Sequence, residues 1–169
     1  MQNMDIAKEN LDELISIVDK ASSDTRSISH NLMPPEFEKT PLTDLLQGYY
    51  SKLNRETNTR FLFISKGRGQ RFPKNTELTI YRIIIEITKN ILKHSKATEA
   101  TIQLIYEDDG LEIMAEDNGI GIGKAATDGI GMKNIHSRVN FINGTITIDS
   151  GKKGTTFIIH VPYKNENYK

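Results

Sequence analysis

The chain has 169 residues, and its 22 lysines and arginines balance 22 aspartates and glutamates, so its formal charge is zero. This balance argues against non-specific binding to nucleic acid, and the absence of cysteine excludes disulfides and thiolate metal sites. The apolar runs are far shorter than the roughly 20 residues that span a bilayer, and a secretory signal is missing. We expect one full domain with a helical appendage, cytoplasmic or forming the cytoplasmic part of a membrane-bound protein.

Residues 4–32 show the spacing of a coiled coil, with seam positions alternately three and four residues apart. The seam consists of Met4, Ala7, Leu11, Leu14, Val18, Ala21, Thr25, Ile28 and Leu32. Such regularity indicates a helix that needs a partner helix, supplied by a second copy of the chain or by sequence outside it. A helix packed on its own domain is the alternative. We expect Pro34-Pro35 to end the helix, because proline disfavours helical geometry in the residue before it.

The remaining sequence alternates helical and strand patterns. Helices are predicted at about 41–56, from Asn75-Thr76-Glu77 to about Ser95, and at about 131–141, and strands at about 60–66, 101–107, 111–117, 145–149 and 155–161. Strands interleaved with helices that cover one face predict an α/β two-layer sandwich. We divide the chain into residues 1–40 (helix and linker), 41–163 (the domain) and 164–169 (a frayed tail).

The helix predicted at 78–92 is apolar except for one stripe at helical spacing. The stripe consists of Arg82, Glu86, Asn90, Lys93 and His94. A solvated face would produce the same pattern, but an exposed helix rarely places asparagine in its middle, where its propensity is poor. The carbonyl of Asn90 beside a carboxylate suits a Mg²⁺ ion that bridges phosphates, and Lys93 would lie close enough to meet phosphate charge.

The strand predicted at 111–117 alternates, so that Asp117 falls on its apolar, helix-covered face. A carboxylate at the end of a buried face is costly unless a hydrogen-bond donor meets it. The amino group of an adenine is such a donor. An aspartate that caps the turn before Asn118-Gly119 is an equally good explanation.

Glycines follow Asp117 in two groups. Gly119 and Gly121 allow positive φ and a close backbone approach to a flat ring. They do not form a Walker loop, because Asn118 and Ala125 stand where that loop needs a glycine and a hydroxyl. The link Ile122–Asp128 has the composition of a small lid.

The second group, Gly129 and Gly131, opens the helix that contains Met132. Free amides at a helix start favour phosphate. In the last predicted strand, Thr155 lies on the apolar face, where its hydroxyl could complete the polar contacts near Asp117. In this order and at this spacing, the stripe on the helix, Asp117 and the two glycine groups indicate an ATP site.

These segments resemble a known family. Residues 60–163 are similar to the Bergerat-fold (GHKL) catalytic domain of two-component sensor histidine kinases, related to gyrase, chaperone and mismatch-repair ATPases. The matching segments are Glu86–Ala97 (N-box), Asp117–Gly121 (G1 box), Gly129–Val139 (G2 box) and the closing Gly154-Thr155. The compact lid, the Asn90-x3-His94-Ser95 pattern and the stretch Arg26–Leu42 resemble the subfamily whose H-box reads Glu-Leu-His-Asp.

The resemblance implies ATP and Mg²⁺ as cofactors and a role for each residue. Asn90 would be the metal ligand, Asp117 would contact the adenine amino group, and Glu86 would be the catalytic carboxylate, polarising or basic. Lys93 and His94 would face the phosphates. Further implied nucleotide contacts are Gly119, Gly121, Gly129, Gly131, Met132 and Thr155. The implied partners are a second copy, bound through the N-terminal helix, and a response regulator.

The chain departs from this family at the phosphoacceptor. An H-box with histidine followed by an acidic residue is missing, and His30, followed by Asn31, matches the family's linker instead. We therefore expect phosphoryl transfer to a histidine outside these residues. A non-catalytic, nucleotide-gated interaction module is one alternative, which the intact Glu86, Asn90 and Asp117 disfavour. An anti-sigma-type serine kinase of the same fold is another, which the long heptad helix disfavours.

Overall fold

The computed structural model describes residues 36–68, 71–122 and 129–163. The chain divides into two units, Met1–Lys39 and Thr40–Lys169. Of the first unit only the short helix α2 (Glu36–Lys39) is described. The heptad helix expected at 4–32 and the tail at 164–169 lie outside the described residues and remain predictions.

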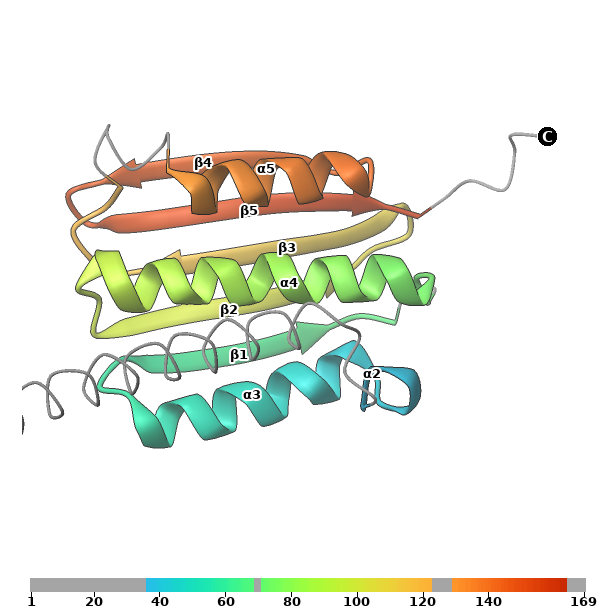
Figure 1. Ribbon diagram of the computed structural model, residues 1–169, viewed down its shortest axis with the longest axis horizontal. Coiled ribbons are helices and arrows are strands. Elements are labelled where there is room, and N and C mark those ends of the chain that lie inside the picture. The colour runs from blue at the N-terminus through green and yellow to red at the C-terminus, as the bar shows by residue number, and fades with distance from the viewer. Residues whose placement is uncertain (1–35, 69–70, 123–128, 164–169) are drawn as a thin grey trace, which may run out of the picture. The chain divides into compact units, whose positions relative to one another are not determined.

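Five strands form one mixed sheet in the order β1-β2-β3-β5-β4 (Figure 1). Their bounds are β1 (Arg60–Lys66), β2 (Glu99–Tyr106), β3 (Gly110–Asp117), β4 (Thr145–Gly151) and β5 (Gly154–Pro162). β1 runs parallel to β2, and the other neighbouring pairs are antiparallel. All five predicted strands are confirmed, with their ends shifted by at most two residues.

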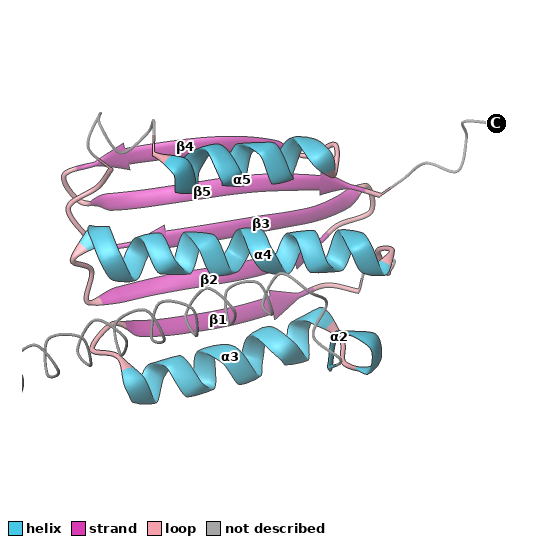
Figure 2. Ribbon diagram, in the orientation of Figure 1, coloured by secondary structure: helices cyan, strands magenta, loops and turns pink. Residues whose placement is uncertain are grey.

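Three longer helices lie on the same face of this sheet (Figure 2). They are α3 (Leu42–Glu56), α4 (Lys74–Asn90) and α5 (Ile130–Phe141), and a π-helical turn, Ile91–Ser95, prolongs α4. Because α4 joins β1 to β2, it supplies the crossover that a parallel pair requires. The predicted α/β two-layer sandwich is therefore confirmed. In the described ranges, no helix combines the length and apolar character that crossing a membrane demands.

The core lies between the helices and the sheet. On β3 the side chains alternate as predicted, because Leu111, Ile113 and Asp117 are buried whereas Glu116 on the other face is exposed. The apolar face of α4 contributes Ile80, Ile83, Ile84 and Ile87, all buried. Burial of each such side chain stabilises the fold by about 1.5–3 kcal/mol. This packing holds α4 on the face of the sheet on which Asp117 lies.

One tyrosine of α3 enters the core. Tyr50 is fully buried, whereas its neighbour Tyr49 is only half-buried. The Tyr50 ring stacks on Phe61 and Phe63, with centroid distances of 5.5 and 5.6 Å. Its hydroxyl is 2.8 Å from the hydroxyl of Thr88 on α4. A tyrosine can be buried in a core when its hydroxyl has a hydrogen-bond partner there, and apolar periodicity alone does not reveal such a partner.

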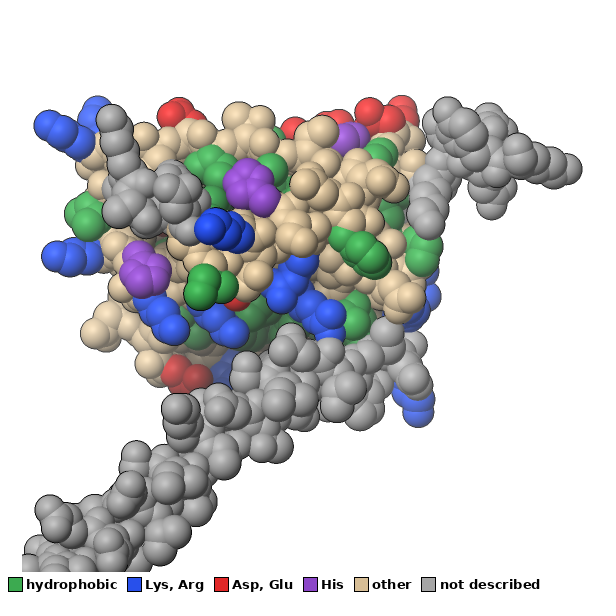
Figure 3. Space-filling view, turned by 45° about the horizontal axis from the view of Figure 1, so that its top comes forward, with side chains coloured by type: hydrophobic (Ala, Val, Ile, Leu, Met, Phe, Trp, Pro, Cys, Tyr) green, Lys and Arg blue, Asp and Glu red, His purple; other side chains and the backbone are tan. Residues whose placement is uncertain are grey.

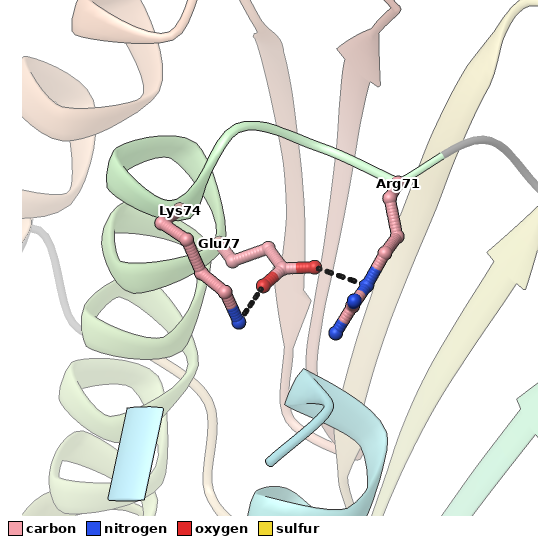
Figure 4. A network of polar contacts seen from close by, with 3 residues as sticks. All are labelled: Arg71, Lys74 and Glu77. Atoms are coloured by element: carbon pink, nitrogen blue, oxygen red, sulfur yellow. Dashed lines mark hydrogen bonds and ion pairs between the residues drawn. The ribbon is translucent and has the colours of Figure 1, made fainter. Parts of the chain in front are cut away.

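A buried carboxylate lies at the opposite end of the sheet from Asp117, where α4 begins. The Glu77 side chain is only 7% exposed, and its oxygens lie 3.2 Å from Lys74 Nζ and 4.0 Å from Arg71 Nε (Figure 4). A recess of about 350 Å³ beside it is lined also by Ser65 and Tyr106. Burial raises the pKa of Tyr106 to about 12, and the charge of Glu77 adds to the rise.

Candidate functional site

A cavity of about 410 Å³ opens at the edge of the sheet where β3 ends and β5 begins. The end of α4, the π-helical turn, the loop after β3 and the start of α5 complete its walls. Most of the site residues predicted from the sequence line it: Asn90, His94, Asp117, Gly121, Gly129, Gly131, Met132 and Thr155. The fold therefore gathers the predicted segments around one concave site.

Asp117 occupies the buried end of β3 and is 4% exposed. Its Oδ1 accepts a hydrogen bond from the backbone N–H of Gly119 at 2.8 Å, which favours the ionised carboxylate. Burial outweighs this bond and raises the pKa of Asp117, and the negative charge of Glu116 adds to the rise. The residue thus caps a turn, as one explanation held, and also lines the cavity, where its remaining acceptor capacity calls for a donor.

The π-helical turn Ile91–Ser95 connects α4 to the loop that follows Asp117. The Ser95 hydroxyl donates to the carbonyl of Ile91 at 2.8 Å and accepts from the N–H of Ala97 at 3.0 Å. The Ser95 carbonyl accepts a hydrogen bond from the N–H of Ile120 at 2.8 Å. Turns of this type are rare and concentrate at functional sites. Here the turn fixes the loop after β3 to the end of the helix that carries Asn90.

The start of α5 lies close to α4 at Gly131. A Cβ atom at Gly131 would lie 2.9 Å from Glu86 Oε1 and 3.3 Å from Asn90 Oδ1. The oxygens of Glu86 and Asn90 therefore both lie close to the space beside Gly131. An amide oxygen and a carboxylate with room for water are ligands that suit Mg²⁺, so the residues present fit that ion. In the described part of the chain, three or more histidine or acidic side chains nowhere form a closed metal cage.

The other predicted residues lie nearby in different settings. His94 is exposed and lines the cavity, whereas Lys93 is exposed and does not. Of the first glycine pair, only Gly121 uses positive φ, at 77°. Gly119 is required for space instead, because a Cβ there would collide with the Ser95 carbonyl oxygen.

The loop after β3 is also bonded to the hairpin of β4 and β5. The N–H of Ile122 donates to the hydroxyl of Ser150 at 2.6 Å, and that hydroxyl lies 3.0 Å from the hydroxyl of Thr155. Thr155 is buried, lines the cavity and is the register partner of Asp117 across β3 and β5. The predicted position of its hydroxyl near Asp117 agrees with this arrangement. Most of the lid expected at Ile122–Asp128 lies outside the described residues.

The sequence reasoning did not single out the apolar lining of the cavity. That lining includes Ile91, Ile120, Ile122, Ile130 and Phe157. Ile120 and Ile130 are 59% and 80% exposed, and large exposed apolar side chains at a concave site are typical of ligand-binding walls. The available signal was that both isoleucines stand between the glycines of the predicted site, where no strand or helix core would hold them.

The helical side of the domain carries a positive charge excess near the cavity. Figure 3 shows lysine and arginine side chains gathered around the middle of the view, with most acidic side chains along its upper edge. Lys89 on α4, Lys93 on the π-helical turn and Lys133 on α5 are exposed. Such a surface attracts an anionic ligand to the adjacent cavity.

Comparison with protein-family profiles identifies the family to which this domain belongs. The profile described as histidine kinase-, DNA gyrase B-, and HSP90-like ATPase matches residues 75–165, more than half of the chain. The chain belongs to this family of ATPases. The domain formed by these residues is therefore an ATPase domain of the histidine kinase, DNA gyrase B and HSP90 type.

The relatives are themselves histidine kinases. The chain is 25% identical over 168 residues to the signal transduction histidine-protein kinase/phosphatase DegS of Brevibacillus brevis, covering 98% of this chain and 44% of that protein. It is 23% identical over 165 residues to the oxygen sensor histidine kinase NreB of Staphylococcus carnosus, covering 95% of this chain and 48% of that protein. The chain thus spans less than half the length of these two relatives.

Solved structures show the same fold. A blue-light activated histidine kinase of Erythrobacter litoralis matches with a TM-score of 0.67 at 19% identity, covering 89% of this chain and 51% of that one. The histidine kinase AdeS of Acinetobacter baumannii matches with a TM-score of 0.61 at 14% identity, covering 89% of this chain and 81% of that one. The fold is therefore of the Bergerat type, as the sequence resemblance implied.

Proposed function

We propose that this chain is the catalytic, ATP-binding part of a two-component sensor histidine kinase. It uses Mg-ATP to phosphorylate a histidine that residues 1–169 do not supply, for relay to a response regulator. The observation that carries this proposal is the cavity itself, which brings a buried carboxylate, Asp117, together with the side chain of Asn90. Glu86 does not line the cavity, but its Oε1 lies beside Gly131, which does.

Recognition of the nucleotide base falls to Asp117. An ionised, buried carboxylate accepts hydrogen bonds and donates none, so it selects a ring that presents an amino group, as adenine does. A guanine carbonyl at the same place would leave two acceptors facing each other. The exposed Ile120 and Ile130 beside the cavity supply apolar walls for a flat ring, and Gly121 keeps the loop backbone clear of it.

The phosphates are held at the α4 and α5 side of the cavity. Asn90 would supply an oxygen for Mg²⁺, and the bound ion would neutralise phosphate charge. The first backbone amides of α5, at Gly129 to Gly131, attract the anionic phosphate chain. Lys93 and His94 add donors at the exposed rim.

Phosphoryl transfer of this kind depends mainly on positioning and charge stabilisation. We assign Glu86 to the attacking side, where its carboxylate polarises or accepts a proton from the acceptor imidazole. Its carboxylate lies near Asn90 and next to Gly131, which has no side chain to block it, and this position suits that role. The histidine then carries a phosphoryl group bonded to a ring nitrogen, with ADP as the leaving group.

The resemblance to sensor histidine kinases also suggests how the chain is divided into parts and how it dimerises. We propose that residues 1–40 form the second helix of a dimerisation hairpin with its linker, and that residues 41–163 form the catalytic domain. The subfamily would be the one with a compact lid and a Glu-Leu-His-Asp H-box. The parent protein would act in the cytoplasm or at the cytoplasmic side of a membrane.

The test of this function is Asp117→Asn. Because a hydrogen bond to a charged group is worth about 1.5–3 kcal/mol, we expect the substitution to weaken Mg-ATP binding about 10- to 150-fold. Isothermal titration calorimetry measures this affinity directly. The matched control is Asp149→Asn, an isosteric change at an exposed position of β4, which should leave affinity unchanged.

A second readout separates a kinase from a binding module. The wild-type chain is mixed with a peptide helix that carries an H-box, and acid-labile phosphate on the peptide is measured. Transfer that Asp117→Asn abolishes supports the proposal. Equal ATP affinity in wild type and Asp117→Asn would refute the site, and tight ATP binding without transfer would favour the module.

A further inference from the structure

Ser150 links two parts of the cavity that the sequence does not connect. It stands near the end of β4, directly opposite Thr155 in the register of the β4–β5 hairpin. Its hydroxyl accepts the N–H of Ile122 at 2.6 Å and lies 3.0 Å from the Thr155 hydroxyl. The serine is exposed at the surface, whereas Thr155 is buried in the cavity wall.

The loop after β3 meets the hairpin at a second point beside this bond. A Cβ atom at Gly121 would collide with the carbonyl oxygen of Gly151, the residue that follows Ser150. The backbone at Gly121 and Ile122 therefore runs directly against the end of the hairpin. Both residues line the cavity, so the position of this backbone defines one wall of the site.

The donor and acceptor capacity of a hydroxyl limits how Ser150 and Thr155 can share their hydrogen bond. A serine hydroxyl has one proton and two lone pairs. The Ile122 N–H occupies one lone pair, which leaves the proton and the second lone pair for Thr155. When Ser150 donates its proton, the Thr155 hydroxyl keeps its own proton for an acceptor in the cavity, beside its register partner Asp117.

We propose that Ser150 is a positioning residue of the nucleotide site. It fixes the backbone at Ile122 and orients the hydroxyl of Thr155, so that Thr155 donates into the cavity next to the acceptor Asp117. The proposal rests on the proposed function, because the ligand that benefits is the bound nucleotide. Ser150 itself does not line the cavity and touches the ligand only through these two residues.

The test compares Ser150→Ala with Ser150→Thr, which retains the hydroxyl and suits a strand. Loss of one net hydrogen bond corresponds to about a fivefold change in affinity. We expect Mg-ATP binding to weaken about five- to tenfold in Ser150→Ala and to stay within about twofold of wild type in Ser150→Thr. Thr147→Ala, at an exposed position of the same strand, is the control and should bind like wild type.

Two further readouts distinguish positioning from simple structural support. Amide hydrogen exchange at Ile122, measured without nucleotide, should accelerate in Ser150→Ala but not in Ser150→Thr or Thr147→Ala. In a double-mutant cycle, Ser150→Ala and Thr155→Val should be non-additive, because removing Thr155 removes the group that Ser150 orients.

The outcomes are separable. The proposal would be overturned if Ser150→Ala bound Mg-ATP as tightly as Thr147→Ala does. It would also be overturned if the losses of affinity in Ser150→Ala and Thr155→Val were independent, so that the fold-changes multiplied in the double mutant. If Ser150→Ala also lowers the melting temperature, failure of Ser150→Thr to restore binding would overturn it as well. If the wild type binds no Mg-ATP, the proposed function fails. Unchanged hydrogen exchange at Ile122 in Ser150→Ala would separately show that Ser150 does not fix the backbone at Ile122.

Discussion

At the scale of single residues, Asp117 shows how a binding group opposes folding. Its carboxylate is 4% exposed, and burial raises its pKa despite the bond from Gly119. A raised pKa means that the folded state holds the proton more tightly than the unfolded state. The ionised form, which under the proposed function accepts an adenine amino group, is therefore the form that destabilises the nucleotide-free domain.

We predict that stability and nucleotide affinity respond to pH in opposite directions. As pH rises from the unfolded to the folded pKa of Asp117, the free energy of unfolding should fall, and above the folded pKa this contribution should level off. Over the same window Mg-ATP affinity should rise, because the carboxylate becomes ionised. Urea unfolding and calorimetry across a pH series measure the two quantities.

Asp117→Asn is the matched variant for this prediction, because it keeps the shape and removes the charge. Its unfolding free energy should lack the decline with pH and should exceed that of the wild type above the folded pKa of Asp117. An identical pH profile in both proteins would show that Asp117 does not couple charge to folding.

At the scale of elements, the place of Glu86 between α4 and α5 depends on the missing side chain at Gly131. A Cβ at Gly131 would lie 2.9 Å from Glu86 Oε1, the mobile end of a long side chain. The glutamate can move away at little energetic cost, but it then leaves the position beside Asn90. A side chain at Gly131 should therefore disturb the position of Glu86 more than it disturbs the stability of the domain.

We predict that Gly131→Ala separates these two effects. Alanine improves helix propensity by up to about 1 kcal/mol, so the melting temperature should hold or rise. Displacement of Glu86 should nevertheless lower phosphoryl transfer at least about tenfold, since small misplacements of catalytic groups are costly. Gly48→Ala on α3, where a Cβ meets nothing within 4 Å, is the control and should stabilise without changing transfer. Normal transfer in Gly131→Ala would contradict the assignment of Glu86.

The same scale shows what sequence reasoning could reach. Strand alternation placed Asp117 on the buried face, and glycine positions marked the loop and the start of α5, because both signals are local. The π-helical turn at Ile91–Ser95 was read as plain helix, since no residue pattern distinguishes the two. The bond from Ile122 to Ser150 spans 28 positions and depends on strand register, which the sequence does not encode locally.

At the scale of the whole molecule, the sheet keeps its two polar ends separate. Asp117 lies at one end, and the buried Glu77 with Lys74 and Arg71 lies at the other. Both cationic partners are partly exposed, Arg71 at 68%, so solvent weakens these pairs. The Glu77 cluster therefore serves the fold at the start of α4 and not the nucleotide site.

We predict that Glu77→Ala lowers the free energy of unfolding by about 1–2 kcal/mol, because it removes a buried carboxylate and leaves Lys74 without that partner. Mg-ATP affinity should stay unchanged. Glu56→Ala removes the exposed pair with Lys52 and should change stability by less than about 0.5 kcal/mol. Denaturant unfolding with parallel calorimetry tests both, and a loss of affinity in Glu77→Ala would show that the two ends communicate.

The hydrogen bond from Ile120 to Ser95 has a consequence for how the proposed site would accommodate nucleotides of different length. It ties the loop that follows Asp117 to the turn that prolongs the helix ending at Asn90, so the spacing between the proposed base and cation subsites should change little. Adjustment to ATP or ADP would then fall to α5. Structures with each nucleotide should accordingly show a constant distance from Asn90 to Asp117 and a variable one from either residue to Gly131.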